Sequence, residues 1–149
     1  MTKTPEDRVS AALATMRGRG GRTTAPRRAV LDTLTKATHL SASEISARLT
    51  ADDVQIDPST VHRVLSALAD AGVVHTVPVN GTTTYGMADQ AHHHTVCNQC
   101  GKVRQLHHDL AEALVRAVNA DGTVSVDEDG RAGGVVVYGR CTGACPTPA

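Results

Sequence analysis

Residues 57–87 of the chain read "DPSTVHRVLSALADAGVVHTVPVNGTTTYGM", and their first half carries the signals of a short helix. Asp57 is a favourable N-cap residue, because its carboxylate can accept hydrogen bonds from the first free backbone amides. Pro58 suits the first turn, and Gly72 suits the position after the last turn. These signals predict a helix over residues 58–71.

The second half of this stretch, residues 73–87, alternates between short β-prone runs and turn residues. Asn80-Gly81 separates the two runs, and this dipeptide is a strong signal for a tight β-hairpin. Pro78 lacks a backbone N–H, which favours an edge strand. We therefore expect a two-stranded antiparallel hairpin directly after the helix.

One face of the 58–71 helix is apolar at helical spacing and is expected to be buried: Val61, Val64, Leu65 and Leu68. The opposite face is polar and positively charged near its N-terminus. Recognition helices of DNA-binding proteins present such residues to bases and phosphates. The candidate DNA contacts are Ser59, Thr60, His62 and Arg63. The alternative is a solvated face in a helical domain that binds a protein or nothing.

Two further helices are predicted before this stretch, over residues 6–17 and from about Pro26 onward. Another begins at Ser41-x-x-Glu44, which has the pattern of a capping box. Compact helices followed by a hairpin are the parts of a winged helix-turn-helix. Residues 1–36 also contain eight Lys or Arg against three Asp or Glu, which indicates a polyanionic partner.

The composition of the 149-residue chain is that of a folded protein, with 40% hydrophobic and 20% charged residues. No stretch approaches the roughly 18 apolar residues that span a bilayer, and the first residues lack the apolar run of a signal peptide. We therefore expect a cytoplasmic protein without a membrane partner. Thiols stay reduced in that compartment, which disfavours disulfides between its four cysteines.

The chain from about residue 88 has a different character. Residues 107–122 are expected to form a helix with Leu110, Leu114 and Val118 on its apolar stripe. Strands are expected at "CGKVRQL", "TVSV" and "GGVVVYGRC", the last being apolar enough to have both faces covered. The predicted fold class is therefore α+β. It comprises a winged-helix DNA-binding domain over residues 1–87 and a small α/β metal-binding dimerisation domain over residues 88–149.

All four cysteines fall into two close pairs, Cys97-x-x-Cys100 and Cys141-x-x-x-Cys145. A zinc ion takes four soft donors in a tetrahedron, and tight turns bring paired sulfurs within its reach. The pattern predicts a structural Zn²⁺ site of four thiolates, which would contribute directly to folding. The alternative is two pairs of free or redox-active thiols.

Three consecutive histidines precede the first cysteine pair. In strand-like sequence His92 and His94 point to one side and His93 to the other, so His92 and His94 form a ready chelate. His39 and Asp89 would complete a second metal site from the DNA-binding half. Such a site would bridge the two halves and fix their relative angle. The alternative is a set of hydrogen-bonded or exposed histidines.

Four segments, in this order and at these spacings, resemble the ferric uptake regulator (Fur) family of bacterial metal-dependent repressors. They are "RGGRTTAPRRAVLDTL" at 19–34, "HLSASEI" at 39–45, "STVHRVLSALADAGVV" at 59–74 and "HHHTVCNQCGKV" at 92–103. The resemblance implies a homodimer that binds a palindromic operator, with Arg22 near the minor groove and His62 and Arg63 at the recognition helix. It also implies structural zinc on the four cysteines and a sensing site that includes His39, His92 and His94.

The chain departs from the family pattern at several positions. His62 stands where the family usually has Tyr, and Gln105 stands where many members have an acidic ligand. The segment from Tyr85 to Cys97 is one residue short, and Asp89 is the substitute for the usual acid or cysteine ligand. The histidine normally found before the last strand is replaced by Gly133.

These departures bear on a second sensing site of the family. His93 and Glu112 remain from it as a possible remnant, with His107 or His108 as compensating residues. The departures leave the identity of the sensed metal open.

The sequence thus predicts a metal-responsive DNA-binding repressor, not an enzyme, that binds operator DNA as a homodimer when its sensing site is loaded. Zn²⁺ is the first choice of regulatory metal, because imidazole-rich sites suit it. Fe²⁺, Ni²⁺ or Mn²⁺, or peroxide sensing, are alternatives. The rivals from other classes are a metal-buffering protein and a zinc enzyme. For the enzyme, Glu112 is the only tempting base, and no His-Glu-x-x-His is present.

Overall fold

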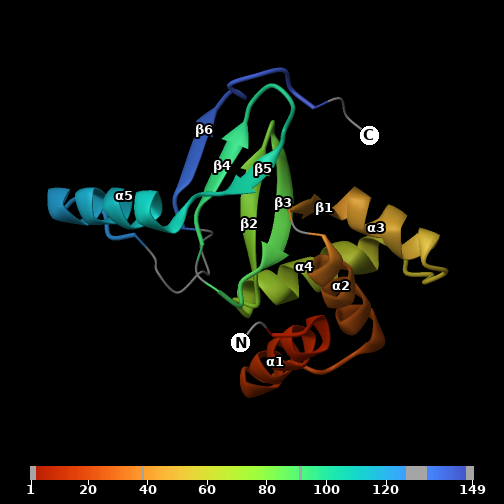
Figure 1. Ribbon diagram of the computed structural model, residues 1–149. Coiled ribbons are helices and arrows are strands. Elements are labelled where there is room, and N and C mark those ends of the chain that lie inside the picture. The colour runs from red at the N-terminus through yellow and green to blue at the C-terminus, as the bar shows by residue number, and fades with distance from the viewer. Residues whose placement is uncertain (1–2, 38, 91, 127–133, 147–149) are drawn as a thin grey trace.

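A computed structural model describes residues 3–37, 39–90, 92–126 and 134–146 of the chain. The predicted α+β class is confirmed, with a helical unit and hairpin followed by a second small sheet (Figure 1). The first part runs in the order α1 (Pro5–Gly18), α2 (Ala25–Lys36), β1 (Leu40–Ser41), α3 (Ala42–Ala51), α4 (Pro58–Asp70), β2 (Val74–Val79) and β3 (Thr82–Met87). The second part runs β4 (His94–Cys97), β5 (Val103–Gln105), α5 (His108–Asp121) and β6 (Val136–Gly139).

The helices begin where the cap signals predict. Asp57 accepts hydrogen bonds from the backbone amides of Ser59 and Thr60 at the start of α4. Ser41 and Glu44 form the expected capping box of α3, each side chain bonding the other's backbone amide. Such caps contribute typically about 1 kcal/mol each, so they fix where each helix starts.

The core of the first part lies between α1, α2, α3 and α4. The four residues predicted to face inward from α4 are all buried, and Leu65 and Leu68 have no exposed surface. They pack in one cluster with residues of the other helices, including Leu31, Leu34 and Ile45. Truncating one such leucine to alanine typically costs about 2–5 kcal/mol. The apolar face of α4 is therefore packed tightly on the core, which fixes the position of this candidate recognition helix.

The hairpin forms as expected. Asn80 and Gly81 both have positive φ, 48° and 80°, as a tight turn of this kind requires. The first sheet has the order β1-β3-β2, so Pro78 does lie on an edge strand. This hairpin stands beside α4 as the wing of a winged helix-turn-helix.

The second sheet has the order β5-β4-β6, with β4 antiparallel to β5 and parallel to β6. It lies against the wing (Figure 1). The hydroxyl of Tyr138 donates to the carbonyl of Pro78 at 2.9 Å. The turn at Gly101 is packed so closely on Val79 that an added Cβ would lie 3.2 Å from its Cγ1.

One expectation for the second part is wrong, and two others concern apolar surfaces that a single chain leaves partly exposed. "TVSV", residues 123–126, forms no strand. On α5 the buried residues are Ala111 and Val115, whereas Leu110 is 63% exposed. The apolar strand β6 has exposed faces, with Tyr138 45% exposed. α5 extends away from both sheets (Figure 1), so the apolar surfaces of α5 and β6 do not cover one another within one chain.

The wing sheet ends at Met87, next to the boundary expected at residue 88, but the division into domains remains a prediction. Within the described residues, no helix is both long enough and apolar enough to cross a membrane.

Candidate metal centres

The four cysteines converge at one end of the second sheet. Cys97 ends β4, Cys100 follows in the turn toward β5, and Cys141 and Cys145 follow β6. Their sulfur atoms all lie within 4.8 Å of one another. The turn residue Gly101 has φ +72°, a left-handed conformation that glycine adopts without strain.

The spacing of these sulfurs fits a tetrahedral metal and not disulfides. The Sγ atoms of Cys97 and Cys145 are 3.8 Å apart, and those of Cys100 and Cys141 are also 3.8 Å apart. A disulfide would need about 2.05 Å. A regular tetrahedron with zinc–sulfur bonds of about 2.3 Å has sulfur–sulfur edges of about 3.8 Å. The donor set and its geometry therefore both suit Zn²⁺.

The electrostatics of the four-cysteine group also call for a cation. Backbone amides, first that of Cys100, lower the pKa of the Cys97 thiol to about 6. Desolvation and then the neighbouring thiol of Cys97 raise the pKa of Cys145 to about 12. Four thiols this close cannot all ionise unless a positive charge sits among them. Lys102, Arg104 and Arg140 line the adjacent hollow of about 410 Å³ and would offset the remaining negative charge.

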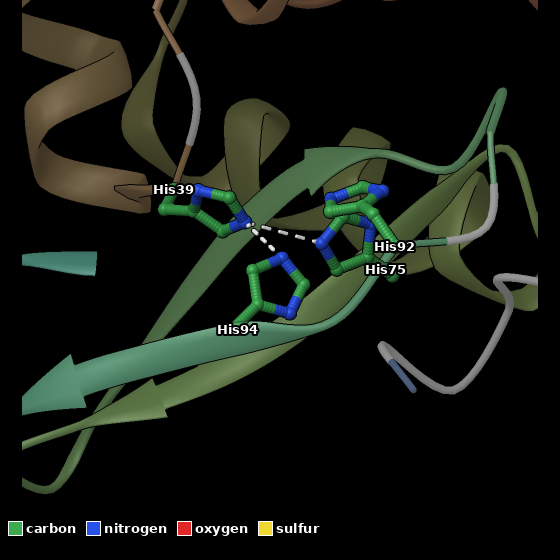
Figure 2. Close-up of side chains that lie close together, drawn as sticks. All are labelled: His39, His75, His92 and His94. Carbon is green, nitrogen blue, oxygen red and sulfur yellow. Dashed lines mark hydrogen bonds between the residues drawn. The ribbon is translucent and has the colours of Figure 1, made fainter. Parts of the chain in front are cut away.

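A second group consists of four histidines from three separate places in the fold: His39, His75, His92 and His94 (Figure 2). His39 precedes β1, and His75 lies in β2 of the wing. His92 and His94 belong to the segment that begins the second sheet. Their ligand nitrogens lie within 4.8 Å of one another, so the group joins the first sheet to the second.

The nitrogens of these histidines face each other as ligands of a common ion would. The Nε2 atom of His39 lies 3.2 Å from Nε2 of His75 and 2.8 Å from Nε2 of His94. One ring nitrogen carries at most one proton, so it cannot donate to both neighbours. Around a tetrahedral ion with bonds of 2.0–2.1 Å, adjacent nitrogens lie about 3.3 Å apart. The donor set therefore fits a borderline metal such as zinc.

The local chain is shaped around these rings. Gly86 pairs with His75 across the hairpin, and a Cβ added there would lie 2.9 Å from Cε1 of His75 and 3.3 Å from Nε2 of His39. His39 itself has φ 60°, a left-handed conformation that costs energy for a residue other than glycine. A glycine that leaves room and a strained ligand are both typical of a functional site.

Burial keeps two of these imidazoles neutral. Desolvation, and then the charge of His92, lower the pKa of His39 to about 4. The same two causes lower the pKa of His75 to about 4. His75 is 1% exposed, and its Nδ1 has no hydrogen-bond partner in the described structure. Neutral imidazoles are the form that binds metal, so the group is ready for a cation near pH 7.

The expectation for Asp89 does not agree with this geometry. Its carboxylate is held by the guanidinium of Arg8, with Nε to Oδ2 at 2.6 Å and Nη2 to Oδ1 at 3.0 Å. Asp89 lines the cavity beside the histidines but is not among the four converging ligands. His75 takes the fourth position instead.

Sequence reasoning missed His75, although a signal was present. His75, Val77 and Val79 alternate along β2 and share one face, while Val74 on the other face joins the helical core. His75 therefore alternates with valines on an apolar face of β2 that is expected to be buried, and a buried histidine needs polar partners.

The suggested remnant site is not assembled in the described residues. Nδ1 of His93 accepts a hydrogen bond from the backbone amide of Val135 at 3.0 Å. Glu112 is exposed on α5, and neither residue belongs to a group of metal-type ligands. His107 is exposed and lies 3.8 Å from Asp109. The side chain of His108 lies outside the described residues.

The residues expected to contact DNA gather on one surface. Arg22, Thr60 and Arg63 line a shallow groove of about 660 Å³ between the segment before α2 and the start of α4. His62 and Ser59 are exposed on the same turns of α4. Their hydrogen bonds stay local: Arg63 donates to Thr60 at 3.0 Å, and the Ser59 hydroxyl donates to Asp57. The surface is basic, and none of these side chains belongs to the hydrophobic core.

A winged helix-turn-helix joined to a second sheet through four histidines, with four cysteines beyond, defines a metal-binding protein of the winged-helix class. The sequence pattern of the ferric uptake regulator family matches residues 18–128. The ferric uptake regulation protein of Escherichia coli K12 is 32% identical over 127 residues, which is 82% of each chain. The peroxide-responsive repressor PerR of Staphylococcus saprophyticus is 30% identical over 78% of this chain and 82% of its own.

Solved structures agree with this relationship. The ferric uptake regulator of Vibrio cholerae superposes with a TM-score of 0.69 at 27% identity, covering 86% of this chain and 98% of its own. The Pseudomonas aeruginosa regulator, solved with manganese, has a TM-score of 0.69 and 27% identity over 87% of this chain and 97% of its own. The chain belongs to the ferric uptake regulator family, whose members are metal-responsive transcription regulators and not enzymes.

Proposed function

We propose that this chain is a repressor that binds operator DNA as a homodimer when its histidine group holds a divalent metal. One observation carries the proposal: the four histidines come from both the wing and the second sheet. An ion bound there would hold the two parts at one angle. The spacing of two recognition helices in a dimer would then depend on occupancy, and half-site spacing on DNA is a geometric requirement.

The two metal groups have separate roles in this proposal. Cys97, Cys100, Cys141 and Cys145 hold a structural Zn²⁺ that closes the end of the second sheet and contributes to folding. The histidines hold the regulatory ion, because neutral imidazoles release metal more readily than four thiolates do. A bound ion supplies charge and fixed geometry, and the histidines orient it between the two sheets.

Zn²⁺ is our first choice of regulatory metal. Four imidazoles at near-tetrahedral spacing suit it, whereas a site with carboxylates would favour harder ions. The exclusion of Asp89 from the group strengthens this choice over Mn²⁺. Fe²⁺ and Ni²⁺ also accept imidazole ligands and are the alternatives that a metal titration must separate.

The DNA-binding surface is formed by Arg22 and the start of α4. Ser59, Thr60, His62 and Arg63 occupy the first turns of α4, the part of a recognition helix that meets base edges. Arg22 reaches the flanking groove from the other side of the hollow. The exposed apolar side chains of Val137 and Tyr138 on β6 supply the surface that a second copy of this chain would cover.

The decisive experiment counts metal and measures DNA binding on the same sample. Duplexes selected from a random pool by the zinc-loaded protein provide the operator probe. We expect one tightly held zinc per chain after mild chelation, one more on reloading, and binding of the selected duplex only in the reloaded state. Equal duplex affinity with and without the second ion would refute the proposal.

A matched pair of variants separates DNA contact from metal binding. Arg63→Ala should weaken duplex binding while both metal ions are retained, because Arg63 is exposed and bonds only within α4. Arg116→Ala, an exposed arginine on α5, is the control and should change neither. A loss of zinc in Arg63→Ala would contradict the separation of the two surfaces.

A further inference from the structure

The pairing of Arg8 with Asp89 joins the first helix to the segment that follows the wing. It is a two-point contact, at 2.6 Å and 3.0 Å, between residues 81 positions apart. The side chains are 25% and 15% exposed, so water screens the contact only in part. Charge-assisted, two-point arginine–carboxylate contacts are both strong and directional.

Asp89 stands at the wall of the histidine group. It lines the same cavity of about 160 Å³ as His39, His75 and His92, together with Arg8. Along the chain it lies between Met87, the end of β3, and His92, only three residues further on. Any ion that fixes His75 and His92 together therefore fixes both ends of the short segment that carries Asp89.

Arg8 lies near the start of α1, and the far end of α1 shapes the DNA-facing loop. Arg17 donates to the hydroxyl of Thr23 at 3.1 Å, and the amide of Gly21 donates to the carbonyl of Met16 at 2.9 Å. From α2, Arg27 donates to the carbonyl of Arg22. The backbone of Arg22 is thus held between the end of α1 and the start of α2.

We propose that Arg8 and Asp89 are positioning residues that couple occupancy of the histidine group to the placement of α1 and of Arg22. This inference rests on the proposed function, because it assigns a route by which the regulatory ion acts on the DNA-binding surface. In the loaded state the segment after β3 is fixed, Asp89 is presented to Arg8, and α1 is held in the binding orientation. In the unloaded state Asp89 no longer orients Arg8, and α1 shifts its orientation while Val9, Leu13 and Met16 stay packed on the core.

The proposal requires Asp89 to act on DNA binding through Arg8 and not as a metal ligand. The coupling is the ratio of the DNA affinity with the regulatory ion to the DNA affinity without it. By reciprocity, bound DNA raises the affinity for the ion by the same factor. Removing the contact lowers that factor and leaves the intrinsic affinity of the four imidazoles in place. A ligand role for Asp89 would give the opposite pattern.

The experiment measures duplex affinity with and without the regulatory zinc in Asp89→Asn, Arg8→Gln and the double variant. In each, we expect the ratio of the two affinities to fall about tenfold, within the usual range of coupling factors. The double variant should fall no further than either single one. Zinc affinity without DNA, from competition with a chromophoric chelator, should fall by no more than this same factor of about ten, because the contact and the ion favour each other reciprocally.

Two matched variants test the specificity of the effect. Glu6→Gln removes the other ion pair of α1, with Arg28 at 3.0 Å, which lies away from the cavity. It should leave the affinity ratio unchanged. Arg8→Lys keeps the charge without the two-point geometry and should recover part of the ratio.

The outcomes distinguish the inference from the function on which it rests. An unchanged affinity ratio in Asp89→Asn overturns the inference, while metal-dependent binding by the unaltered protein keeps the proposed function. Loss of the exchangeable zinc in Asp89→Asn also overturns it, since Asp89 would then be a ligand. Should that variant fail to fold, judged by melting and cysteine-bound zinc, Arg8→Gln carries the same test. No metal dependence in the unaltered protein refutes the proposed function itself.

Discussion

The thiol group and the histidine group differ in how far apart their ligands lie in the fold. The four cysteines come from two tight turns at one end of a single sheet. The four histidines come from the segment before β1, from the wing and from the start of the second sheet. An ion among the cysteines closes one structural unit. An ion among the histidines would tie two units together, so we expect its loss to change their arrangement without unfolding either part.

Loss of a cysteine should have the largest effect. Cys100→Ser is expected to remove the structural zinc and unfold the second sheet, because structural zinc sites contribute on the order of 10 kcal/mol in small domains. Elemental analysis and circular dichroism measure both effects. Asn98 is exposed between Cys97 and Cys100, so Asn98→Ala is the control, and it should keep both the zinc and the fold. A folded, zinc-containing Cys100→Ser protein would contradict the structural role.

Loss of a histidine should affect function more than stability. His75→Gln is expected to weaken binding of the exchangeable ion by more than about 100-fold, since even supporting residues of metal sites contribute 10–100-fold. Zinc on the cysteines should remain, and duplex binding should fall to the level of the chelated protein. His107→Gln, at an exposed histidine outside the group, should behave as the unaltered chain. Retention of tight exchangeable metal in His75→Gln would remove it from the ligand set.

The space at Gly86 offers a finer test of the histidine geometry. Gly86→Ala would place a methyl group 2.9 Å from Cε1 of His75, so the ring must shift. We expect metal affinity to fall about tenfold, the lower end of what supporting residues contribute, with the cysteine-bound zinc unaffected. Gly18→Ala is the matched control, because a Cβ there meets nothing within 4 Å. Titration of both variants with zinc gives the comparison, and equal affinities would show that the rings are not confined.

Acid should destabilise the fold through the two buried histidines. The pKa values of His39 and His75 are about 4 in the fold, against about 6.5 in an unfolded chain. Between these values the unfolded chain binds more protons than the native one. Stability with the histidines empty should therefore fall as the pH drops from about 6.5 toward about 4, and not further below.

Thermal melting of the protein carrying only cysteine-bound zinc measures this slope. His75→Gln lacks one of the two titrating groups, so its melting temperature should depend less steeply on pH. Loading the histidines with zinc should keep this slope and extend it below about pH 4, because bound imidazoles take up no protons while the unfolded chain still does. Identical slopes in the unaltered protein and His75→Gln would show that His75 does not control acid stability.

The sequence predicted what depends on neighbours along the chain. Asp57, the Ser41–Glu44 box and Asn80-Gly81 act within a few residues, so the helix starts and the hairpin were correct. The two cysteine pairs were also recognisable, since each pair lies in one turn. Apolar spacing in α4 likewise settled which face packs on the core.

What escaped prediction depends on contacts between distant segments. Nothing near Asp89 indicates that Arg8, 81 residues away, holds its carboxylate. His75 lies in a largely apolar strand. The face that carries His75 is covered by the second sheet, and the local sequence pattern cannot predict that contact. The apolar stripe of α5 and the run in β6 were recognised, but a single chain does not show what covers them.

The close packing of Gly101 on Val79 limits how this molecule can vary. The turn that carries the first cysteine pair touches the tip of the wing, 3.2 Å from an added Cβ to a methyl of Val79 and 3.6 Å to the amide nitrogen of Asn80. Any side chain at position 101 would therefore have to displace Val79, and the left-handed backbone there would be strained as well, so glycine at this turn is what lets the wing and the cysteine turn pack together.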